Sequence, residues 1–421
     1  MAEVTLSAEA SATGAAAGRQ RWALVAALYL AQSIPSYMLI MAVPAALRSL
    51  GLGLDKVGML SVLMLPLILK FLWAPLVDRT RFGRLGHRRG WVVITQLCTS
   101  AGIALLAFSD PSHITAVLLA GMLIALSIAT QDIATDGYAT RLLRPSERAT
   151  GNGIQAGAVA VGVLLGGTLS MWLFERWGWS ATLLLMASLS LLPLAALPWM
   201  RESPMSTLEV QERASLRRFF QRPGAWSILG LALVYRASEG MVRTMESSYL
   251  MHNGLRLSEA GGLLGSSATV AGLIGSILGA RWLMRSTPDK VLLSLSGMRV
   301  GCYLIFGIHA LGMLAMLGPM GHTPMLGFLA MSLSMLRYME MVGLYALFME
   351  AASPRQPGTD FSVLVCAELL SYMLSAMAGG YIAKQLGFAA MFGVAAALAL
   401  LSWWAARALL ARYRKVLSHD R

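Results

Sequence analysis

The sequence is poor in charged residues. Asp, Glu, Lys and Arg make up 13% of its 421 residues, whereas a soluble globular domain contains about 25%. Hydrophobic residues make up 57% of the chain, and its mean hydropathy is +0.63. The composition therefore excludes an ordinary soluble fold and indicates a protein embedded in lipid.

Cysteines and nucleotide-binding motifs are scarce too. Cys98, Cys302 and Cys366 fall in separate apolar segments, with no C-x-x-C pair and no neighbouring histidine. This pattern excludes a disulfide framework and predicts neither a metal site nor a cofactor. Because the sequence has no G-x-x-x-x-G-K-[ST] motif, nucleotide hydrolysis is not the expected energy source. We expect a protein that is not an enzyme and that uses an ion gradient.

Basic residues outnumber acidic ones by 34 to 21, which gives a net charge of +13. Most of them lie in the N-terminal tail, in the even-numbered connections between apolar segments and in the C-terminal tail. This distribution follows the positive-inside rule and predicts that both termini are cytoplasmic. Since no basic patch interleaved with aromatic residues stands elsewhere, the expected environment is membrane lipid, and nucleic acid is not an expected partner.

A window of about 19 residues finds twelve apolar segments in the chain. Each is predicted to be a helix, because a chain that crosses lipid must satisfy its own backbone hydrogen bonds. The segments are 22–47, 56–76, 91–109, 113–140, 149–174, 179–200, 224–250, 258–284, 290–317, 323–350, 358–384 and 387–411.

The longest hydrophilic connection, 201–223, separates six segments from six. We therefore expect an all-α membrane protein of twelve transmembrane helices in two six-helix halves, present as a monomer. This organisation resembles the major facilitator fold, in which the substrate site lies between the halves. The expected parts are a disordered tail at 1–21, the halves at 22–200 and 224–411, the cytoplasmic linker at 201–223 and a cytoplasmic tail at 412–421.

Glycine pairs with small-xxx-small spacing occur in the fifth and eighth segments, for example Gly153 with Gly157 and Gly275 with Gly279. Such spacings let helix backbones approach closely. In the major facilitator organisation these two helices face each other across the halves. Ordinary packing within each half is an equal alternative.

Two carboxylates, Asp132 and Asp136, follow the apolar run 114–127 one helical turn apart and share one face of the helix. Lys70 lies about 12 Å inside Asp78 along its segment, and Asp132 lies a similar distance of about 13 Å inside Arg141. A charge at that depth needs a partner. We expect Lys70 to pair with Asp132 or Asp136, either as a static ion pair or in proton coupling.

A basic cluster follows Asp78 and Arg79 at the end of the second segment. The pair resembles the cytoplasmic gating motif of major facilitator transporters, in which the Asp holds the half-interface shut. Simple topological anchoring by the arginines is the alternative.

The seventh segment carries Arg236, Glu239, Arg243 and Glu246 within an arc of about 80° on a helix of 3.6 residues per turn. Such a stripe lines a water-filled cavity or braces the helix as an internal ladder of ion pairs. Arginine forks suit carboxylate or phenolate, so we rank Arg236, near the segment's centre, above Arg243 as a substrate contact.

Other polar residues in the apolar segments complete the expected site. Those expected to contact substrate are Gln32, Tyr37, Gln131, Asn152, Gln155, Arg236, Glu239, Arg243, Arg337, Glu340 and Glu368. Those expected in proton coupling or in a buried ion pair are Lys70, Asp132, Asp136 and Glu246.

The sequences KFLWAPLVDR at 70–79 and QDI at 131–133 resemble the AmpG-like branch of the major facilitator superfamily. This branch includes muropeptide permeases, acetyl-CoA transporters and siderophore permeases. ATDG at 134–137, GNGIQ at 151–155 and PGTDF at 357–361 are most similar to the siderophore permeases of the FptX/RhtX type. A muropeptide permease is expected to have Ala in place of Gly137.

The resemblance implies a proton-coupled importer of a siderophore or ferric siderophore in the bacterial inner membrane, working by alternating access. A permease for a muropeptide or another organic anion is the first alternative. A membrane sensor that does not transport is an alternative of another class.

Overall fold

The computed structural model describes residues 2–202, 214–256, 263–314 and 318–419. Every regular element of this part of the chain is helical. The α-helices are α1 (Ala2–Tyr37), α2 (Val43–Ser49), α3 (Leu54–Met59), α4 (Leu65–Leu69), α5 (Ala74–Arg79), α6 (Arg88–Phe108), α7 (Ile114–Leu142), α8 (Arg148–Gly162), α9 (Ser170–Leu191), α11 (Leu216–Gln221), α12 (Ala225–Tyr235), α13 (Glu239–His252), α15 (Ala268–Arg285), α16 (Pro288–Ala310), α17 (Gly318–Ala351) and α18 (Pro357–His419).

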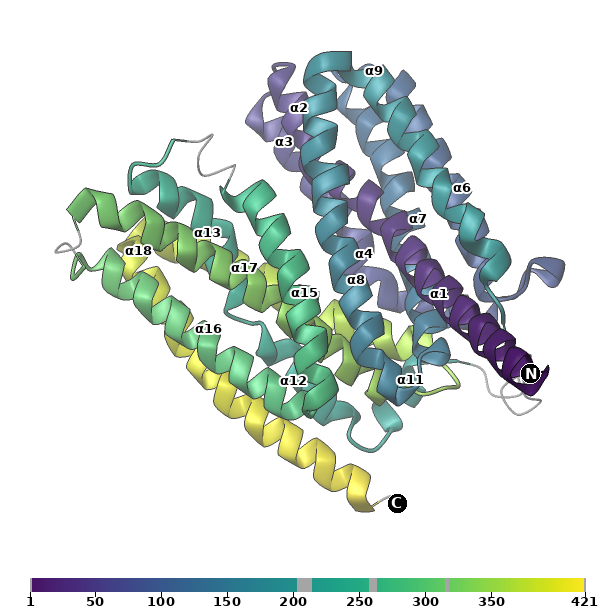
Figure 1. The fold of residues 1–421 in the computed structure, drawn as a ribbon. Coiled ribbons are helices and arrows are strands. Elements are labelled where there is room, and N and C mark those ends of the chain that lie inside the picture. The colour runs from purple at the N-terminus through teal and green to yellow at the C-terminus, as the bar shows by residue number, and fades with distance from the viewer. Residues whose placement is uncertain (1, 203–213, 257–262, 315–317, 420–421) are drawn as a thin grey trace.

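Two bundles of helices make up the molecule (Figure 1). The early helices α2, α3, α6, α7 and α9 lie together, and so do the later helices α12, α13, α16, α17 and α18. One buried apolar cluster draws all its residues from between Met38 and Ala187, and another from between Met241 and Ala399. A third cluster, which includes Tyr29 and Phe361, joins residues of both bundles.

Eight helical stretches are long and apolar enough to cross a membrane, judged by length and composition. Two of them far exceed the roughly 20 residues that span a bilayer. They are Gly18–Ser49, Arg88–Phe108, Ile114–Leu142, Pro145–Trp199, Leu263–Arg285, Pro288–Ala310, Thr323–Ala351 and Pro357–Ser418.

The two longest stretches are each broken at one glycine. Gly178 (φ 73°, ψ −174°) and Gly387 (φ 84°, ψ 171°) adopt a conformation that is open essentially only to glycine. They lie where the sequence separated 149–174 from 179–200 and 358–384 from 387–411. The expected segments 56–76 and 224–250 are interrupted helices, so neither appears among the eight stretches.

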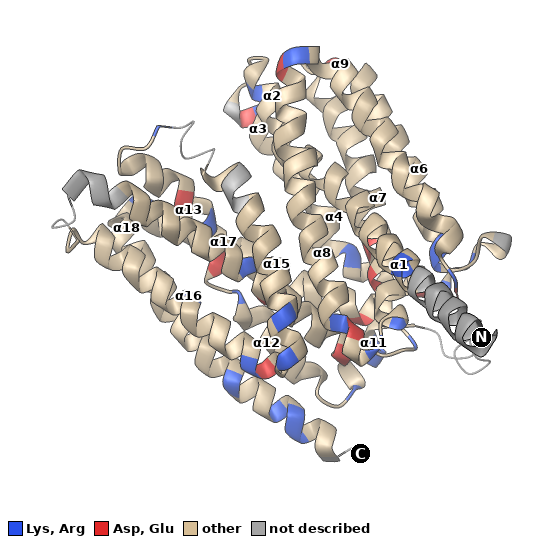
Figure 2. Cartoon of the chain, in the orientation of Figure 1, with Lys and Arg blue, Asp and Glu red and all other residues tan. Residues whose placement is uncertain are grey.

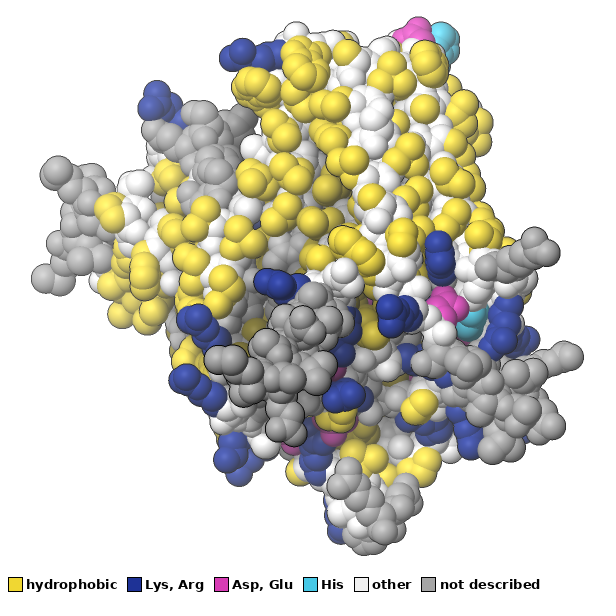
Figure 3. Space-filling view, turned by 45° about the vertical axis from the view of Figure 1, so that its right-hand side comes forward, with side chains coloured by type: hydrophobic (Ala, Val, Ile, Leu, Met, Phe, Trp, Pro, Cys, Tyr) yellow, Lys and Arg dark blue, Asp and Glu magenta, His cyan; other side chains and the backbone are white. Residues whose placement is uncertain are grey.

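Apolar side chains cover the outside of the molecule. Phe108 and Met377 are 78% and 72% exposed, and Figure 3 shows hydrophobic side chains over the upper part of its face. Lys and Arg gather in the lower part, toward the end where both termini lie (Figures 2 and 3). A surface of this kind is costly in water and is stabilised by lipid.

Helices extend into both expected tails. The sequence predicted disorder at 1–21, but α1 begins at Ala2. Its opening stretch is rich in alanine, which has the highest intrinsic helix propensity. Residues 412–419 continue α18. Residues 203–213 of the expected linker lie outside the described residues, and α11 lies within its remainder.

Glycines set several helix contacts. A Cβ on Gly153 would lie 2.9 Å from the Cβ of Ala280, so α8 packs on α15 as the spacing suggested for the two halves. A Cβ on Gly275 would instead lie 2.5 Å from the carbonyl oxygen of Met335, within the second bundle. Both sequence interpretations therefore apply, each to different glycines.

The tightest approach in the second bundle gives a stability prediction. A Cβ on Gly240 would lie 2.0 Å from the carbonyl oxygen of Tyr372, where α13 meets α18. Gly240→Ala should therefore lower the free energy of unfolding by about 1–3 kcal/mol through overpacking. The measurement is the thermal unfolding midpoint in detergent. Gly301→Ala is the matched control, because nothing lies within 4 Å of that Cβ; equal midpoints for the two variants would contradict the tight contact.

Candidate functional site

Lys70 lies at a break in the second apolar segment. Prolines in the first turns of α4 and α5 interrupt the helix, and Lys70 begins the short 3-10 turn between them. Its side chain is buried, and its Nζ forms an ion pair with Asp132 of α7. Gln32 of α1 donates a hydrogen bond of 2.7 Å to the same carboxylate.

Asp136 has a different neighbour. Its carboxylate is 1% exposed and accepts a hydrogen bond of 3.1 Å from the hydroxyl of Tyr29. Of the two acids between which the sequence could not choose, Asp132 is therefore the one that binds Lys70. Asp132 keeps 21% of its side chain exposed. The two carboxylates thus share a helix face but differ in partner and in access to solvent.

Gln131 points away from this cluster. Its amide nitrogen donates 2.8 Å to Gln96, and its amide oxygen accepts 3.2 Å from Thr95, both on α6. Gln96 in turn donates to the backbone of Ser190. The chain of hydrogen bonds joins helices within the first bundle, so the geometry supports a structural role for Gln131 rather than the expected substrate contact.

The second charged site begins at a break between α12 and α13. The helix stops at Tyr235, whose released carbonyl oxygen accepts a hydrogen bond of 2.5 Å from Arg299 of α16. Arg236, in the break, binds both oxygens of Glu239 and one oxygen of Glu368. These charges lie in a low-dielectric interior and depend on one another.

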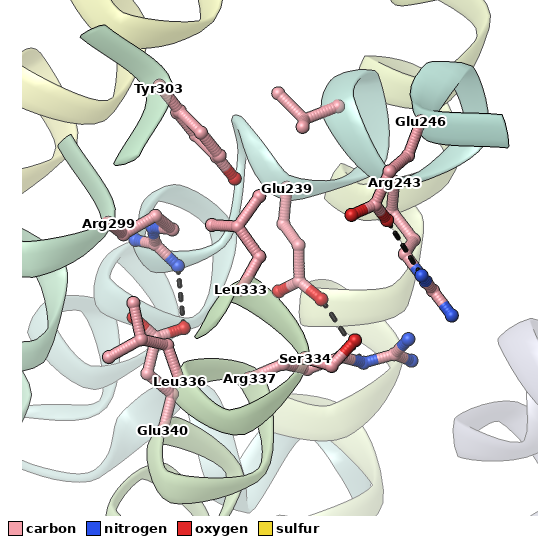
Figure 4. Close-up of a pocket in the computed structure, with 11 residues that line it drawn as sticks. Glu239, Arg243, Glu246, Arg299, Tyr303, Leu333, Ser334, Leu336, Arg337 and Glu340 are labelled. Carbon is pink, nitrogen blue, oxygen red and sulfur yellow. Dashed lines mark hydrogen bonds and ion pairs between the residues drawn. The ribbon is translucent and has the colours of Figure 1, made fainter. Parts of the chain in front are cut away.

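A pocket lies beside this break (Figure 4). In it Arg299 binds Glu340 at 2.8 Å, Arg337 binds Glu239 at 3.2 Å and Arg243 binds Glu246 at 2.7 Å. These pairs come from α13, α16 and α17. The lining residues are Glu239, Val242, Arg243, Glu246, Arg299, Tyr303, Leu333, Ser334, Leu336, Arg337 and Glu340.

The arginines of this site differ in how much of each side chain is exposed. The Arg236 side chain is 7% exposed, and its fork is occupied by two carboxylates. Arg337 and Arg243 are 33% and 28% exposed, each with one carboxylate partner shown. The geometry reverses the expected order: Arg236 is placed to hold the helices, whereas Arg337 and Arg243 have donors free for a solute.

Three expected contacts lie near the interface of the bundles. Asn152 is buried and donates to the backbone of Arg148 at 2.8 Å and to the sulfur of Met349 at 3.4 Å. Gln155 is buried, and its amide oxygen has no hydrogen-bond partner. Tyr37 is half-buried and close enough to Arg337 to interact with its charge.

The expected gate residue Asp78 reaches across to the second bundle. It accepts hydrogen bonds of 2.6 Å from both the backbone nitrogen and the hydroxyl of Thr359, in the first turn of α18, and it forms an ion pair with Arg88. A carboxylate is stabilised at a helix N-terminus. The neighbouring Arg79 instead donates to the carbonyl oxygen of Ala214 at 2.6 Å.

Two glycines make room for this contact. A Cβ on Gly137 would lie 2.7 Å from the guanidinium carbon of Arg88, and one on Gly358 would lie 2.8 Å from Asp78. A second carboxylate strengthens the same end of the molecule: Asp360 binds Arg222 and accepts 2.6 Å from Gln356. We call this set of contacts, Asp78, Arg88, Thr359, Arg222 and Asp360, the latch.

Sequence reasoning missed several partners in these sites. Tyr29 was not expected, because a tyrosine in an apolar segment has no distinctive pattern. Arg299 was visible as a charge in an apolar run, but its partners on other helices could not be read from spacing. Among the described residues, no group of three or more His, Cys, Asp or Glu side chains is arranged to hold a metal ion.

Two bacterial relatives match part of the chain. The anhydromuropeptide permease of Escherichia coli (strain K12) is 30% identical over 252 residues, which cover 58% of this chain and 51% of that protein. An uncharacterized protein of Haemophilus influenzae is 26% identical over 270 residues, which cover 62% of this chain and 64% of that protein. The chain therefore spans about half the length of the permease it matches.

Solved structures share the fold over nearly the whole chain. The human organic anion transporter MFSD10 (TETRAN) has a TM-score of 0.68 at 18% identity and covers 92% of this chain and 99% of its own. A bacterial homologue of the iron transporter ferroportin, in an outward-facing state, has a TM-score of 0.68 at 20% identity. The match covers 93% of this chain and 99% of that chain. The E. coli fucose:proton symporter FucP has a TM-score of 0.70 at 14% identity. The match covers 92% of this chain and 98% of that chain.

At these identities the structural likeness concerns the fold alone. The sequence provides the family: the model of the Major Facilitator Superfamily matches residues 25–359. Because this match spans well over half of the chain, the chain belongs to the Major Facilitator Superfamily, whose members are membrane transporters and not enzymes.

Proposed function

We propose that the chain is a secondary transporter that moves an organic anion across the bacterial inner membrane by alternating access. In this proposal twelve helices form two six-helix halves, the termini are cytoplasmic and the protein acts as a monomer. The breaks at Gly178 and Gly387 support the proposed number of twelve helices, because each break divides one long stretch into two spans. The basic residues at the end that carries both termini support the orientation (Figure 2).

The latch supports a closed cytoplasmic side. It joins the two bundles through Asp78 and Thr359 and lies in the same region as the basic connections around Arg88 and Arg222. With that side held shut, the solute would enter from the opposite side. The role of Asp78 and Arg79 in gating is part of this proposal.

The anion preference rests on one observation: Arg337 and Arg243 are partly exposed, and each has one carboxylate partner. The remaining guanidinium donors of each arginine can therefore bind an acceptor of the solute. A carboxylate or phenolate of the solute would supply it in fork geometry. Tyr37, on α1, is close to Arg337 and would complete the contact from the other bundle.

Among organic anions, an anhydromuropeptide-type solute is the better supported choice. It is the solute named for a relative that is 30% identical over 58% of this chain, and such a sugar–peptide carries carboxylates. Import of a siderophore remains the second candidate. It rests on the sequence at 134–137, where Gly137 leaves space that the guanidinium of Arg88 occupies.

Arg337 tests the proposed solute site. Arg337→Ala should raise the apparent KM for uptake about 10- to 100-fold, because a hydrogen bond to a charged group contributes about 1.5–3 kcal/mol. Arg337→Lys should recover part of this loss, since it keeps the charge but not the fork. Uptake is measured in vesicles with labelled anhydromuropeptide in one arm and labelled ferric siderophore in the other.

Arg281→Ala is the matched control, because Arg281 is an exposed arginine of α15. It should leave the KM unchanged. Wild-type kinetics for Arg337→Ala with either solute would contradict its assignment, and accumulation of neither solute would contradict the proposed substrate class.

The gate is tested with a native thiol. Cys366 is buried in α18 and contacts the carbonyl oxygen of Leu67 across the bundles. Asp78→Asn removes the charge that Arg88 and Thr359 bind, so it should open the cytoplasmic side and raise the labelling rate of Cys366 about 10-fold or more. Labelling is measured with a maleimide in a Cys98→Ser/Cys302→Ser background.

Asp110→Asn, an exposed acid in the loop between α6 and α7, serves as the control and should not change labelling. If Cys366 in the Asp78→Asn variant reacts no faster than in this control, the latch is not a gate.

A further inference from the structure

The charges of the cluster around Lys70 do not balance. Lys70 interacts with the charges of two acids, Asp132 and Asp136. In the second bundle the numbers are equal among the described residues of the break and its pocket: Arg236, Arg243, Arg299 and Arg337 face Glu239, Glu246, Glu340 and Glu368. If every group were ionised, only the Lys70 cluster would carry an uncompensated negative charge.

We propose that Asp132 and Asp136 share one proton against the single cation Lys70, and that Asp136 holds it in this conformation. The inference deepens the proposed transport function, because the shared proton would be the coupling ion. Two carboxylates on one helical turn cannot both ionise in a buried site with one cation. Lys70 binds Asp132, so Asp132 is the ionised member and Asp136 the neutral one.

The surroundings of the two acids differ in a way that gives the proton a route. Asp132 is 21% exposed and lies beside Gln32, whose amide oxygen is buried without a hydrogen-bond partner. Asp136 is 1% exposed and bonded to Tyr29. A proton therefore arrives at Asp132 and is stored at Asp136.

The transfer needs only one proton and one ion-pair exchange. The O–H bond of a protonated Asp132 breaks as an O–H bond forms on the Asp136 carboxylate. The Lys70 ammonium moves from Asp136 to Asp132 at the same time, so the negative charge stays paired. No other reactant is required.

Among the described residues, the titratable groups that interact with Asp136 include a thiol and tyrosine hydroxyls, besides Lys70 and Asp132. Cys366 of α18 interacts with Lys70 and with both acids. Tyr345 of α17 interacts with both acids and also with Glu368 and Arg236. Tyr345 is therefore within electrostatic range of both the proton site and the arginine site of the second bundle.

Infrared difference spectroscopy of the full chain in lipid vesicles tests the sharing. The spectra compare acid with alkaline pH without any substrate, and each protonated carboxyl contributes a C=O band that ionisation removes. At neutral pH, Asp132→Asn and Asp136→Asn should each lose one carboxyl band relative to the wild type, because the remaining acid is then paired with Lys70. Lys70→Met should gain one band, and Lys70→Met with Asp136→Asn should return to the wild-type amplitude.

Asp110→Asn, at the exposed loop, should leave the amplitude unchanged. A wild-type band in Asp132→Asn would mean that burial alone protonates Asp136, and it would overturn the sharing. The double variant keeps the test valid if Lys70→Met does not fold, since it leaves one carboxyl group without a cation where Lys70→Met leaves two.

Two further variants assign the proton. Tyr29→Phe removes the hydrogen bond to Asp136 and should shift the band frequency, whereas Gln32→Leu, which touches Asp132, should not. An unchanged band frequency in Tyr29→Phe would overturn the assignment to Asp136. No solute is present in these spectra, so they test the proton site alone. The uptake assay tests the transport proposal, and the two failures are therefore distinguishable.

Discussion

The structure depends on pairing charge inside an apolar body. An isolated charge in such an interior is expensive, so each buried arginine or lysine is held where a carboxylate from another helix reaches it. Arg299 meets Glu340, Arg236 meets Glu368 and Lys70 meets Asp132. These ion pairs fix the relative positions of helices that apolar packing alone would hold weakly, because the hydrophobic effect contributes little between helices in lipid. The arrangement of the helices and the location of the sites therefore have a common cause.

Much of the fold follows from sequence because its determinants are local. Apolar length, proline and glycine mark where helices begin and break, as at Gly178 and Gly387. Depth along a helix placed Lys70 level with Asp132. Local rules could not predict which partner a charge takes. Arg236 seemed open to a solute from its position on the stripe, but Glu368 from a distant part of the chain fills its fork. Gln131 likewise turned to Gln96 on another helix.

At the latch, two glycines make room for the ion pair between Asp78 and Arg88. The sequence marked Gly137 only as a family signature, with no physical reason attached. In the fold, the guanidinium of Arg88 lies where a methyl group would be, and Gly358 opens the same space from the other bundle. The two glycines are therefore requirements of the Asp78 contact. A reader of the sequence alone sees residues far apart and cannot know that they border one ion pair.

The glycine turns have a mechanical consequence. At Gly178 and at Gly387 a single non-helical residue separates two helices, so the helices on either side of each glycine are joined by a very short connection. Such pairs must rotate as stiff units. Bending is easier where the backbone hydrogen-bond ladder is already interrupted, and two of these interruptions are the turn at Lys70–Leu72 and the break at Arg236–Ser238. These two interruptions carry buried charges, so a change in the ionisation of Lys70 or Arg236, or of their partners, would act directly on places where the helices can flex.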